Sequence, residues 1–305
     1  MAGLVYIGDF DDPDAGTITS RSPDLHWIQL GKPASCYTMR FDPPSSQWEL
    51  SVDGESFSSS LLQNATRIIY RRWRSSPPRD LVVPTDESPI AAFVSRQWTE
   101  AMLGAIVTSY RASANKWSRD PRLVDLKLDT LAILAKLGAL PETSVNMTIA
   151  TSRSVKRVAK HISIDQSFQN GRVATALIGP NRANRGDGYP IISQTHLNER
   201  TELRVLYYFG RARAVSHTFP TAANEGPTNT DRRFTPSIAR AAAPLTADEE
   251  LLLREVARSL SLNVFTGDMI RHAGGTYLID VNPDGLIHNC DTEDGHLASL
   301  YSWAD

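Results

Sequence analysis

The stretch that most constrains the fold runs from Asn263 to Gly285 and reads as two strands joined by a tight, glycine-rich turn. Successive side chains of a strand point to opposite faces. One face of the second strand is therefore predicted to carry Thr276, Leu278, Asp280 and Asn282. With the turn centred near Gly274, Asp268 of the first strand lies opposite Asp280.

Two carboxylates that face each other across a strand pair repel unless a cation lies between them. Asp268, Asp280 and Asn282 offer hard oxygen atoms of the kind that Mg²⁺ accepts together with water and phosphate oxygens. The pattern therefore predicts a divalent-cation site on this hairpin. The same residues also fit a plain strand end that runs into an Asx/proline turn, and the sequence alone leaves both interpretations open.

The whole chain, at 305 residues, is long enough for two or three structural units. A hydrophobic content of 41% with 22% charged residues indicates a globular protein, and a net charge of −2 argues against general affinity for nucleic acid. No run of about 18 apolar residues predicts a membrane span, and the N-terminal segment lacks the pattern of a signal peptide. Only Cys36 and Cys290 occur, which fits a reducing compartment, so a cytoplasmic location is expected.

The N-terminal third alternates short strands with turns and predicts a small sheet domain. The expected strands are Leu4–Gly8, His26–Leu30, Cys36–Phe41, Gln47–Val52 and Arg67–Trp73. Ser88 followed by Pro89 predicts a helix that continues to about Tyr110. A second helix is expected to begin at Asp120-Pro121 and to end at Gly138. Its buried stripe would be Val124, Leu128, Leu131 and Leu134.

The rest of the chain is predicted to consist of short strands and two helices. Residues 141–150 read as a strand and turn, 154–162 as a short basic helix, and 172–179 and 189–194 as strands. The polar loop 180–188 is either a lid over a polyphosphate or an ordinary hairpin tip. The last predicted pieces are a hairpin at 202–218, a long connection at 219–243 and a helix opened by the capping box Thr246–Glu249.

The order of these pieces resembles that of ATP-grasp ligases, and within that superfamily it is most similar to the maturases of graspetides, peptides cross-linked by side-chain esters and amides. The resemblance covers nearly the whole chain. Besides the strand that ends at 280–285, the matching segments are Tyr70-Arg71-Arg72, Gly138–Thr143, Glu202–Val205 and Asp231-Arg232-Arg233. It implies a mixed α+β or α/β ATP-grasp fold. The implied parts are an N-terminal sheet domain (1–112), a central small lobe with a lid loop (113–194) and a C-terminal lobe with the acidic hairpin (195–305).

The resemblance also implies ATP and Mg²⁺ as cofactors and assigns roles to individual residues. The metal ligands would be Asp268, Asp280 and Asn282. The catalytic residues, steadying the phosphoryl group and the acyl phosphate, would be Arg204 and Arg233. The nucleotide would be bound by Lys127, Lys160 and a hinge of Gln194, Thr195, His196 and Leu197. The substrate would be bound by Arg71, Arg72 and Asp231, although an arginine-rich strand end is also compatible with plain solvation.

Three positions depart from the pattern of that family. Asp280 stands where the family usually has Glu, and Thr195 stands where an acidic residue is expected beside Gln194. Ala176-Leu177 stands where a phosphate-binding Lys-Pro pair is expected. Loss of one charge-assisted contact costs roughly 1.5–3 kcal/mol unless another cation replaces it. The candidate replacements are Lys156, Lys160, Arg172, Arg182 and Arg185.

The function implied by the resemblance is ATP-dependent ligation that macrocyclises a ribosomal precursor peptide. A carboxylate would be activated as an acyl phosphate and then attacked by a side-chain hydroxyl or amine. The expected partner is the precursor peptide, without nucleic acid or membrane, and a homodimer is left open. Two alternatives also fit the sequence: a degenerate ATP-grasp protein that binds a peptide or protein partner, and a ligase for a small amino acid or dipeptide.

Overall fold

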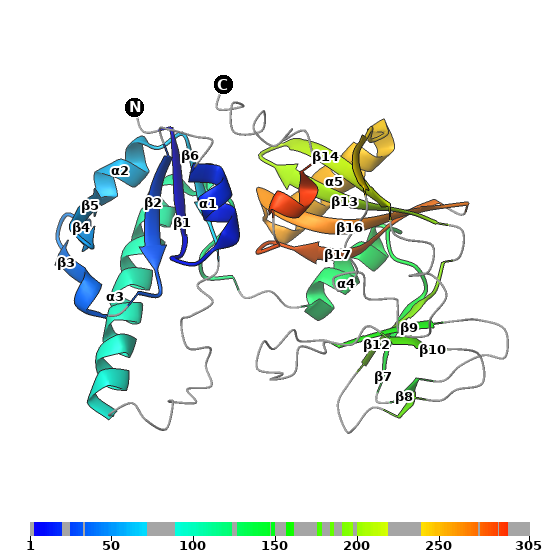
Figure 1. The fold of residues 1–305 in the computed structure, drawn as a ribbon, viewed down its shortest axis with the longest axis horizontal. Helices are drawn as coiled ribbons and strands as arrows, with labels where there is room; N and C mark the ends of the chain where they lie inside the picture. Colours follow the sequence, from blue (N-terminus) through cyan, green and yellow to red (C-terminus); the bar gives the residue numbers. More distant parts are fainter. Residues whose placement is uncertain are drawn as a thin grey trace.

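The computed structural model describes residues 3–19, 25–32, 34–71, 89–123, 127–146, 148–149, 157–161, 176–178, 184–185, 191–197, 200–218, 239–273, 275–285 and 287–291. Figure 1 shows an N-terminal group of elements on one side, a five-stranded sheet on the other, and a small sheet below the latter. Among these residues no helix has both the length and the apolar character to cross a membrane.

The N-terminal unit comprises the elements β1–β6 and α1–α3. Its parallel sheet has the order β2-β1-β6, with β1 at Leu4–Asp9, β2 at Leu25–Leu30 and β6 at Arg67–Tyr70. Its antiparallel sheet consists of β3 (Tyr37–Asp42), β4 (Gln47–Val52) and β5 (Glu55–Ser58). The helical segments are α1 (Pro13–Thr19), η1 (Ala34–Cys36), α2 (Ser59–Asn64), α3 (Pro89–Ser113) and η2 (Ala114–Lys116). Every residue of β1 is buried, as expected for the central strand of a parallel sheet covered on both faces.

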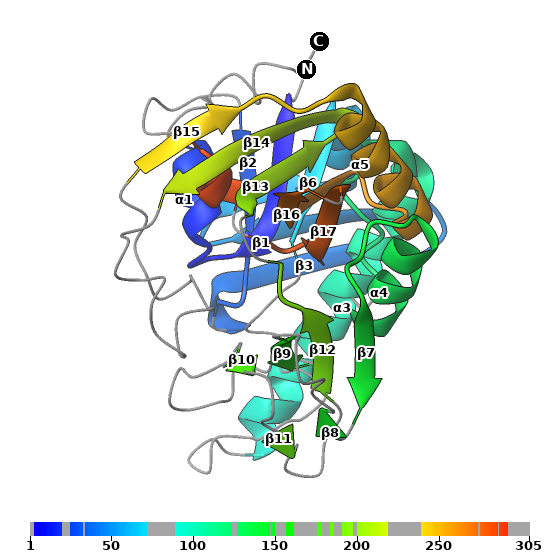
Figure 2. The same cartoon turned by 90° about the vertical axis from the view of Figure 1, so that its right-hand side faces the viewer.

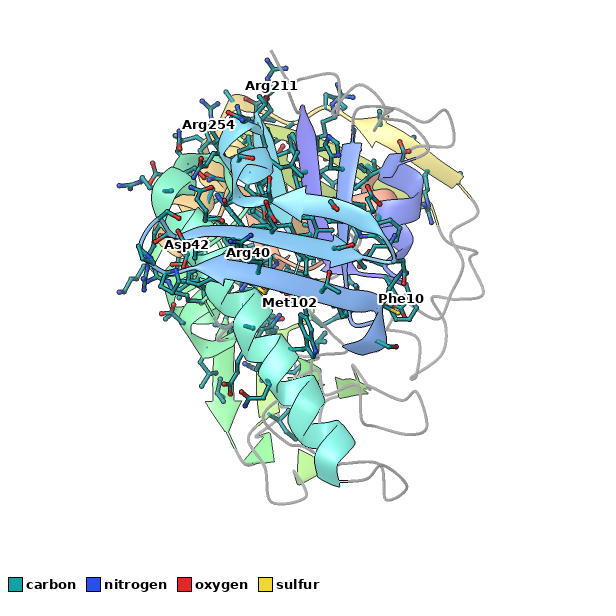
Figure 3. The ribbon with its side chains drawn as sticks, turned by 90° about the vertical axis from the view of Figure 1, so that its left-hand side faces the viewer. Phe10, Arg40, Asp42, Met102, Arg211 and Arg254 are labelled. Carbon is teal, nitrogen blue, oxygen red and sulfur yellow. The ribbon has the colours of Figure 1, made fainter. Side chains whose placement is uncertain are left out.

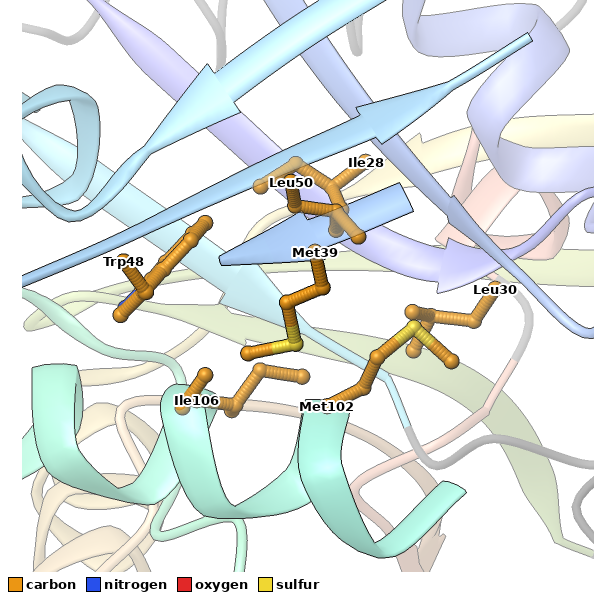
Figure 4. A pocket seen from close by; sticks show the side chains of 8 residues that line it. Ile28, Leu30, Met39, Trp48, Leu50, Met102 and Ile106 are labelled. Atoms are coloured by element: carbon orange, nitrogen blue, oxygen red, sulfur yellow. The ribbon is translucent and has the colours of Figure 1, made fainter. Parts of the chain in front are cut away.

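The long helix α3 crosses the antiparallel sheet, with Met102 pointing toward it (Figure 3). Apolar side chains from helix and strands fill this layer, and a cavity of about 10 Å³ lies beside Met39, Trp48 and Met102 (Figure 4). The eight side chains that line the cavity are apolar or aromatic. An apolar space of this size is a gap in core packing, not a ligand site.

The five-stranded antiparallel sheet has the order β15-β14-β13-β16-β17. Its strands are β13 (Thr201–Tyr208), β14 (Arg211–Thr218), β15 (Ala239–Ala243), β16 (Val264–His272) and β17 (Gly275–Asn282). Helix α5 (Ala247–Leu260) packs on one face and begins with the predicted capping box, in which Thr246 and Glu249 bond each other's backbone N–H. Helix α4 (Lys127–Lys136) lies beside α5 and contributes Leu134 to the same core.

The small sheet lies below the five-stranded sheet in both views (Figures 1 and 2). Its order is β10-β9-β12-β7, with β7 at Thr143–Asn146, β9 at Arg157–His161, β10 at Ala176–Ile178 and β12 at Ile191–Thr195. A short pair, β8 (Thr148–Ile149) and β11 (Asn184–Arg185), forms a separate two-stranded sheet. The last described helical segment is η5 (Ile287–Cys290).

Two sequence predictions for helices are wrong. Helix α4 begins at Lys127 and not at Asp120, because the Asp120 carboxylate accepts hydrogen bonds from the backbone and side chain of Arg122 and caps a turn. Leu128 is 48% exposed, so it does not belong to the buried stripe. The predicted basic helix at 154–162 is strand β9 where it is described, because residues 157–161 pair with strands on both sides and tertiary pairing overrides local preference.

Several elements have no counterpart in the sequence predictions. Strand β15 occupies residues 239–243, inside the predicted long connection. Helices α1 and α2 and strand β5 are also additional. They are four to seven residues long, too short for periodicity to identify them.

The N-terminal unit and the five-stranded sheet share one apolar core, which includes Leu4, Tyr6 and Ile69 on one side and Leu206, Tyr208 and Val264 on the other. Backbone hydrogen bonds reinforce this contact through Ser118, whose N–H donates to Ile68 O at 2.8 Å and whose carbonyl accepts from Asn263 N at 2.7 Å. The two parts therefore form one packed body, and the N-terminal unit covers part of the sheet face opposite α5.

Candidate functional site

The acidic hairpin forms as predicted, with Asp268 directly opposite Asp280. Its register shifts next to this pair, because Met269 pairs with Leu278 and a bulge therefore interrupts β17 between Leu278 and Asp280. Leu278 and Val281 both lie in the core beneath α5. Asp280 and Asn282 flank Val281 and so point to the opposite face.

The bulge corrects one sequence prediction. Regular alternation places Thr276, Leu278, Asp280 and Asn282 on one face, but in the structure Leu278 packs beneath α5 and Thr276 donates to Glu249 of α5. Without the extra residue, Asp280 would share the buried face of Leu278. The bulge is thus the local feature that turns the acid out of the core.

The polar part of the sheet face opposite α5 is here called the open face, and it carries Arg204, Thr266, Asp268, Asp280 and Asn282. Arg204 Nη1 donates to Asp268 Oδ1 at 2.5 Å, and Lys127 at the start of α4 pairs with Asp280. Each acid of the facing pair therefore has a cation of its own. These two ion pairs offset the repulsion between the carboxylates.

Arg204 is held as a cation by its surroundings. Burial on its own disfavours the charged guanidinium, but the nearby Asp268 carboxylate outweighs this and raises the pKa of Arg204. Beneath it, burial raises the pKa of the Cys290 thiol to about 12, and Cys290 Sγ lies 3.5 Å from Val205 O. Cys290 is therefore a neutral packing group at physiological pH and not a nucleophile.

The donor set of the open face suits Mg²⁺. Asp268 and Asp280 are partly exposed carboxylates, and Asn282 Oδ1 accepts from Asp284 N at 2.9 Å, which fixes the amide and leaves an oxygen lone pair for a ligand. In the described part of the chain no three His, Cys, Asp or Glu side chains form a metal cluster. The third donor of the predicted set is the Asn282 amide, which is not one of these four residue types.

The predicted nucleotide hinge is tied to the small sheet by its own hydrogen bonds. Gln194 is buried and donates to Thr143 Oγ1 at 3.3 Å, while Arg200 donates to Leu197 O at 2.7 Å and lies 2.6 Å from His196 Nε2. These contacts hold Gln194, His196 and Leu197 in place.

Glu142 lies beside the predicted hinge, and the sequence analysis did not identify it. Its carbonyl accepts from Thr195 N at 2.9 Å, and its carboxylate Oε2 lies 3.4 Å from Thr195 Oγ1. Hydrogen bonding from Arg157 lowers the pKa of Glu142. The carboxylate of the residue that precedes β7 thus stands beside Thr195, where the sequence lacked an acid. Only the pairing of β7 with β12 brings them together, so no local signal identifies Glu142.

Of the predicted phosphate-binding positions, Lys160 lies on the inner strand β9, across from Ile192. Ala176-Leu177 lies on the edge strand β10, and Arg185 lies in β11. Several further predicted residues and most of the predicted lid loop lie outside the described residues: Arg72, Lys156, Arg172, Arg182, Asp231 and Arg233.

Arg71 occupies a different environment from the predicted substrate surface. It is 2% exposed, and Asp12 and Asp14 of the N-terminal unit surround its guanidinium. It also donates to the backbone carbonyls of Asp284 and Gly285, in the turn that follows Asn282. The structure therefore places Arg71 inside a buried ion network behind the open face.

No family model and no curated protein matches this chain. Among solved structures, it is similar to the RiPP-associated ATP-grasp ligase of Chryseobacterium gregarium in complex with ADP and a leader and core peptide, with a TM-score of 0.69, 16% identity and coverage of 100% of this chain and 96% of that one. It is similar to the ATP-grasp ligase PsnB complexed with minimal precursor, Mg and ADP (TM-score 0.69, 15% identity, 99% and 96% covered). It is also similar to the macrocyclase MdnB from Microcystis aeruginosa MRC, with a TM-score of 0.65, 15% identity and coverage of 100% of this chain and 99% of that one. At these identities the likeness shows the fold: the chain has the ATP-grasp fold that the sequence resemblance implied.

Proposed function

We propose that this chain is an ATP-dependent carboxylate ligase that cross-links side chains of a ribosomal precursor peptide. The observation that carries the proposal is the open face, where two opposed acids, an amide oxygen and two cations converge on one end of an ATP-grasp sheet. The fold neighbours support it, because the Chryseobacterium gregarium ligase and PsnB are described with ADP and a peptide bound.

In this proposal Asp268, Asp280 and Asn282 hold Mg²⁺, which when bound supplies positive charge to the phosphate oxygens of ATP. Lys127 and Arg204, which now neutralise the acids, would turn toward those phosphate oxygens. The two ion pairs therefore keep in place the same cations that a polyphosphate requires. Among the candidate replacements for the missing lysine we favour Lys160, because β9 is an inner strand of the sheet that carries the hinge.

The proposed reaction has two steps. A carboxylate oxygen attacks the γ-phosphorus of ATP, the bond to ADP breaks, and an acyl phosphate forms. A side-chain hydroxyl or amine then attacks the acyl carbon, phosphate leaves, and the nucleophile's proton passes to solvent. Arg204 and Arg233 would stabilise the charge that spreads over the phosphoryl oxygens. The peptide would lose one water per cross-link.

The wider assignment belongs to the same proposal. It includes the division at residues 1–112, 113–194 and 195–305, a peptide partner bound through Arg72 and Asp231, and a cytoplasmic location. A homodimer is compatible with it and is tested by mass measurement in solution.

A thermal-shift experiment tests the nucleotide site. We expect Mg²⁺ with ATP to raise the Tm of the wild type and not that of Asp280→Asn, because a neutral amide is a weaker Mg²⁺ ligand. Asp129→Asn, an exposed change on α4, is the control and should respond like the wild type. A wild type without any shift would favour the degenerate, partner-binding alternative.

Mass spectrometry tests the chemistry. We expect a candidate precursor peptide rich in Thr, Glu, Asp and Lys to lose one water per cross-link with wild-type protein, ATP and Mg²⁺, and to stay unchanged with Asp280→Asn. Turnover of ATP with amino acids or dipeptides, without loss of water from the peptide, would instead support the small-substrate ligase.

A further inference from the structure

We infer that Arg71 is a positioning residue that holds the turn at residues 282–285 and thereby presents Asn282 to the cation. The inference rests on the proposed function, because it assigns a purpose to the metal-ligand turn. Arg71 follows β6 in the N-terminal unit, whereas the turn follows β17, more than two hundred residues later in the chain. The N-terminal unit would therefore shape the metal site from behind.

The guanidinium of Arg71 reaches two successive carbonyls of the turn. Its Nη2 donates to Asp284 O at 2.6 Å and its Nη1 donates to Gly285 O at 3.2 Å. A planar fork with fixed donors sets both the distance and the direction of these carbonyls. The backbone that leaves Asn282 thus has a defined path.

Two acids of the N-terminal unit orient the same guanidinium. Asp12 Oδ2 lies 3.1 Å from Arg71 Nε, and Asp14 pairs with Nη1. Asp14 Oδ2 also accepts from Ile287 N at 2.7 Å and so holds the chain just beyond the turn. Burial opposes the charge of Arg71, but Tyr6 and these two acids outweigh it and raise its pKa.

A second buried arginine, Arg119, connects this network to Asn282 through Asp284. Arg119 Nη1 donates to Asp284 Oδ2 at 3.0 Å, and its Nη2 donates to Leu123 O at 2.7 Å. The backbone N–H of Asp284, held between the two arginines, donates to Asn282 Oδ1 at 2.9 Å. The orientation of the Asn282 amide therefore depends on where Arg71 and Arg119 place Asp284.

The turn packs closely against Thr266 of β16 at Gly285. A Cβ added to Gly285 would lie 1.7 Å from Thr266 Oγ1 and 3.0 Å from Thr266 Cβ. Thr266 of β16 thus packs against the turn, and Arg71 hydrogen-bonds its carbonyls. A lysine at position 71 keeps the charge but has a single nitrogen, which cannot serve both carbonyls and both acids in the fork geometry.

The test compares Arg71→Lys with Arg67→Lys. Arg67 is the matched control, because it begins β6, the strand that Arg71 follows, and stacks 4.6 Å over the Phe209 ring in the same contact between units. Its contacts, with the Phe209 ring and Thr66 O, lie outside the turn. For each protein, Mg²⁺ is titrated in the presence of saturating AMPPNP, AMPPNP is titrated without metal, and thermal unfolding is recorded.

We expect Arg71→Lys to remain folded and to bind Mg²⁺ at least about tenfold more weakly, as observed for partners that orient metal ligands. Its metal-free affinity for AMPPNP should stay within about twofold of the wild type, and Arg67→Lys should match the wild type in both titrations. A purely structural role would lower both affinities equally, and this result would overturn the inference.

The outcomes separate the inference from the proposed function. If the wild type binds no Mg²⁺ with AMPPNP, the proposed function fails and the inference fails with it. If Arg71→Lys binds Mg²⁺ like the wild type, the inference alone is overturned. Should Arg71→Lys not fold, Arg119→Lys is the variant that decides, because it weakens the hydrogen bond to the Asp284 carboxylate. Weaker Mg²⁺ binding by Arg119→Lys would support the inference, and unchanged binding would refute it.

Discussion

The side chains on the two faces of the five-stranded sheet are stabilised by different interactions, although the same strands build both faces. On the α5 face, Val205, Phe265 and Leu278 are buried in a shared apolar core. On the open face, Arg204 and Asp268 take the equivalent alternate positions and meet in an ion pair. Apolar packing fixes one arrangement, whereas ion pairs can change partners at small cost when a ligand offers compensating charge.

The bulge in β17 is the point where the two faces divide. On one side of it Leu278 enters the core, and on the other Asp280 leaves it. Because Gly267 has no side chain, the strands approach closely at this point: a Cβ there would lie 2.8 Å from Asp280 O. The comparison therefore predicts that changes on the α5 face alter folding, and that changes on the open face alter ligand binding first.

The largest effect on stability is expected from Phe265→Ala on the α5 face. Phe265 is fully buried and stacks on Tyr207 with ring centroids 5.3 Å apart. Its truncation leaves a cavity and should lower the free energy of unfolding by about 3–5 kcal/mol, measured by urea denaturation. The control is Leu251→Ala on the exposed side of α5, with an expected change within about 0.5 kcal/mol. Equal effects of the two substitutions would contradict the division between the faces.

A smaller effect is expected from Gly285→Ala behind the open face. The new methyl group overlaps Thr266 Oγ1, so the turn must shift, and we expect a loss of about 1–3 kcal/mol. In a double-mutant cycle, Thr266→Ala should recover part of this loss, because it removes the clashing hydroxyl. Additive effects of the two substitutions would show that Gly285 is constrained by something other than Thr266.

Much of this fold could be predicted because the signals were local. The hairpin at 263–285, the capping box at Thr246–Glu249 and helix α3 each have their own periodicity or cap. The sequence predicts a helix at strand β9 because its basic residues carry no period-2 pattern, and only its two neighbouring strands make it a strand. Such partners are distant in sequence and leave no mark on the segment itself.

The candidate site divides in the same way. The acids Asp268 and Asp280 could be predicted, because strand alternation and a turn centre fix their register. The bulge that turns Asp280 outward could not, since one extra residue in a strand has no composition of its own. Glu142 and Arg119 lie beside the candidate site because of pairing and packing between distant parts of the chain, and no sequence pattern around either residue predicts this.

The smallest effect, and the one that sharpens the comparison most, is expected from Glu249→Gln, because Glu249 is a polar exception on the α5 face. Its carboxylate accepts from Arg271 Nε at 2.7 Å and from Thr246 N at 2.9 Å, and the bond to Arg271 is the main cause of its lowered pKa. A carboxyl whose pKa is lower in the folded state stabilises the fold above its unfolded pKa, and this contribution fades as the pH falls through the folded pKa. We therefore expect a loss of about 1–2 kcal/mol at neutral pH that shrinks toward zero below about pH 4, measured by urea denaturation across this range. Phe265→Ala should show no such pH dependence. Glu255→Gln, a change at a partly exposed position on the same helix, should have little effect at any pH. A penalty for Glu249→Gln that persists in acid would mean that shape and not charge fixes α5 to the sheet, and the polar exception would then belong with the apolar packing around it.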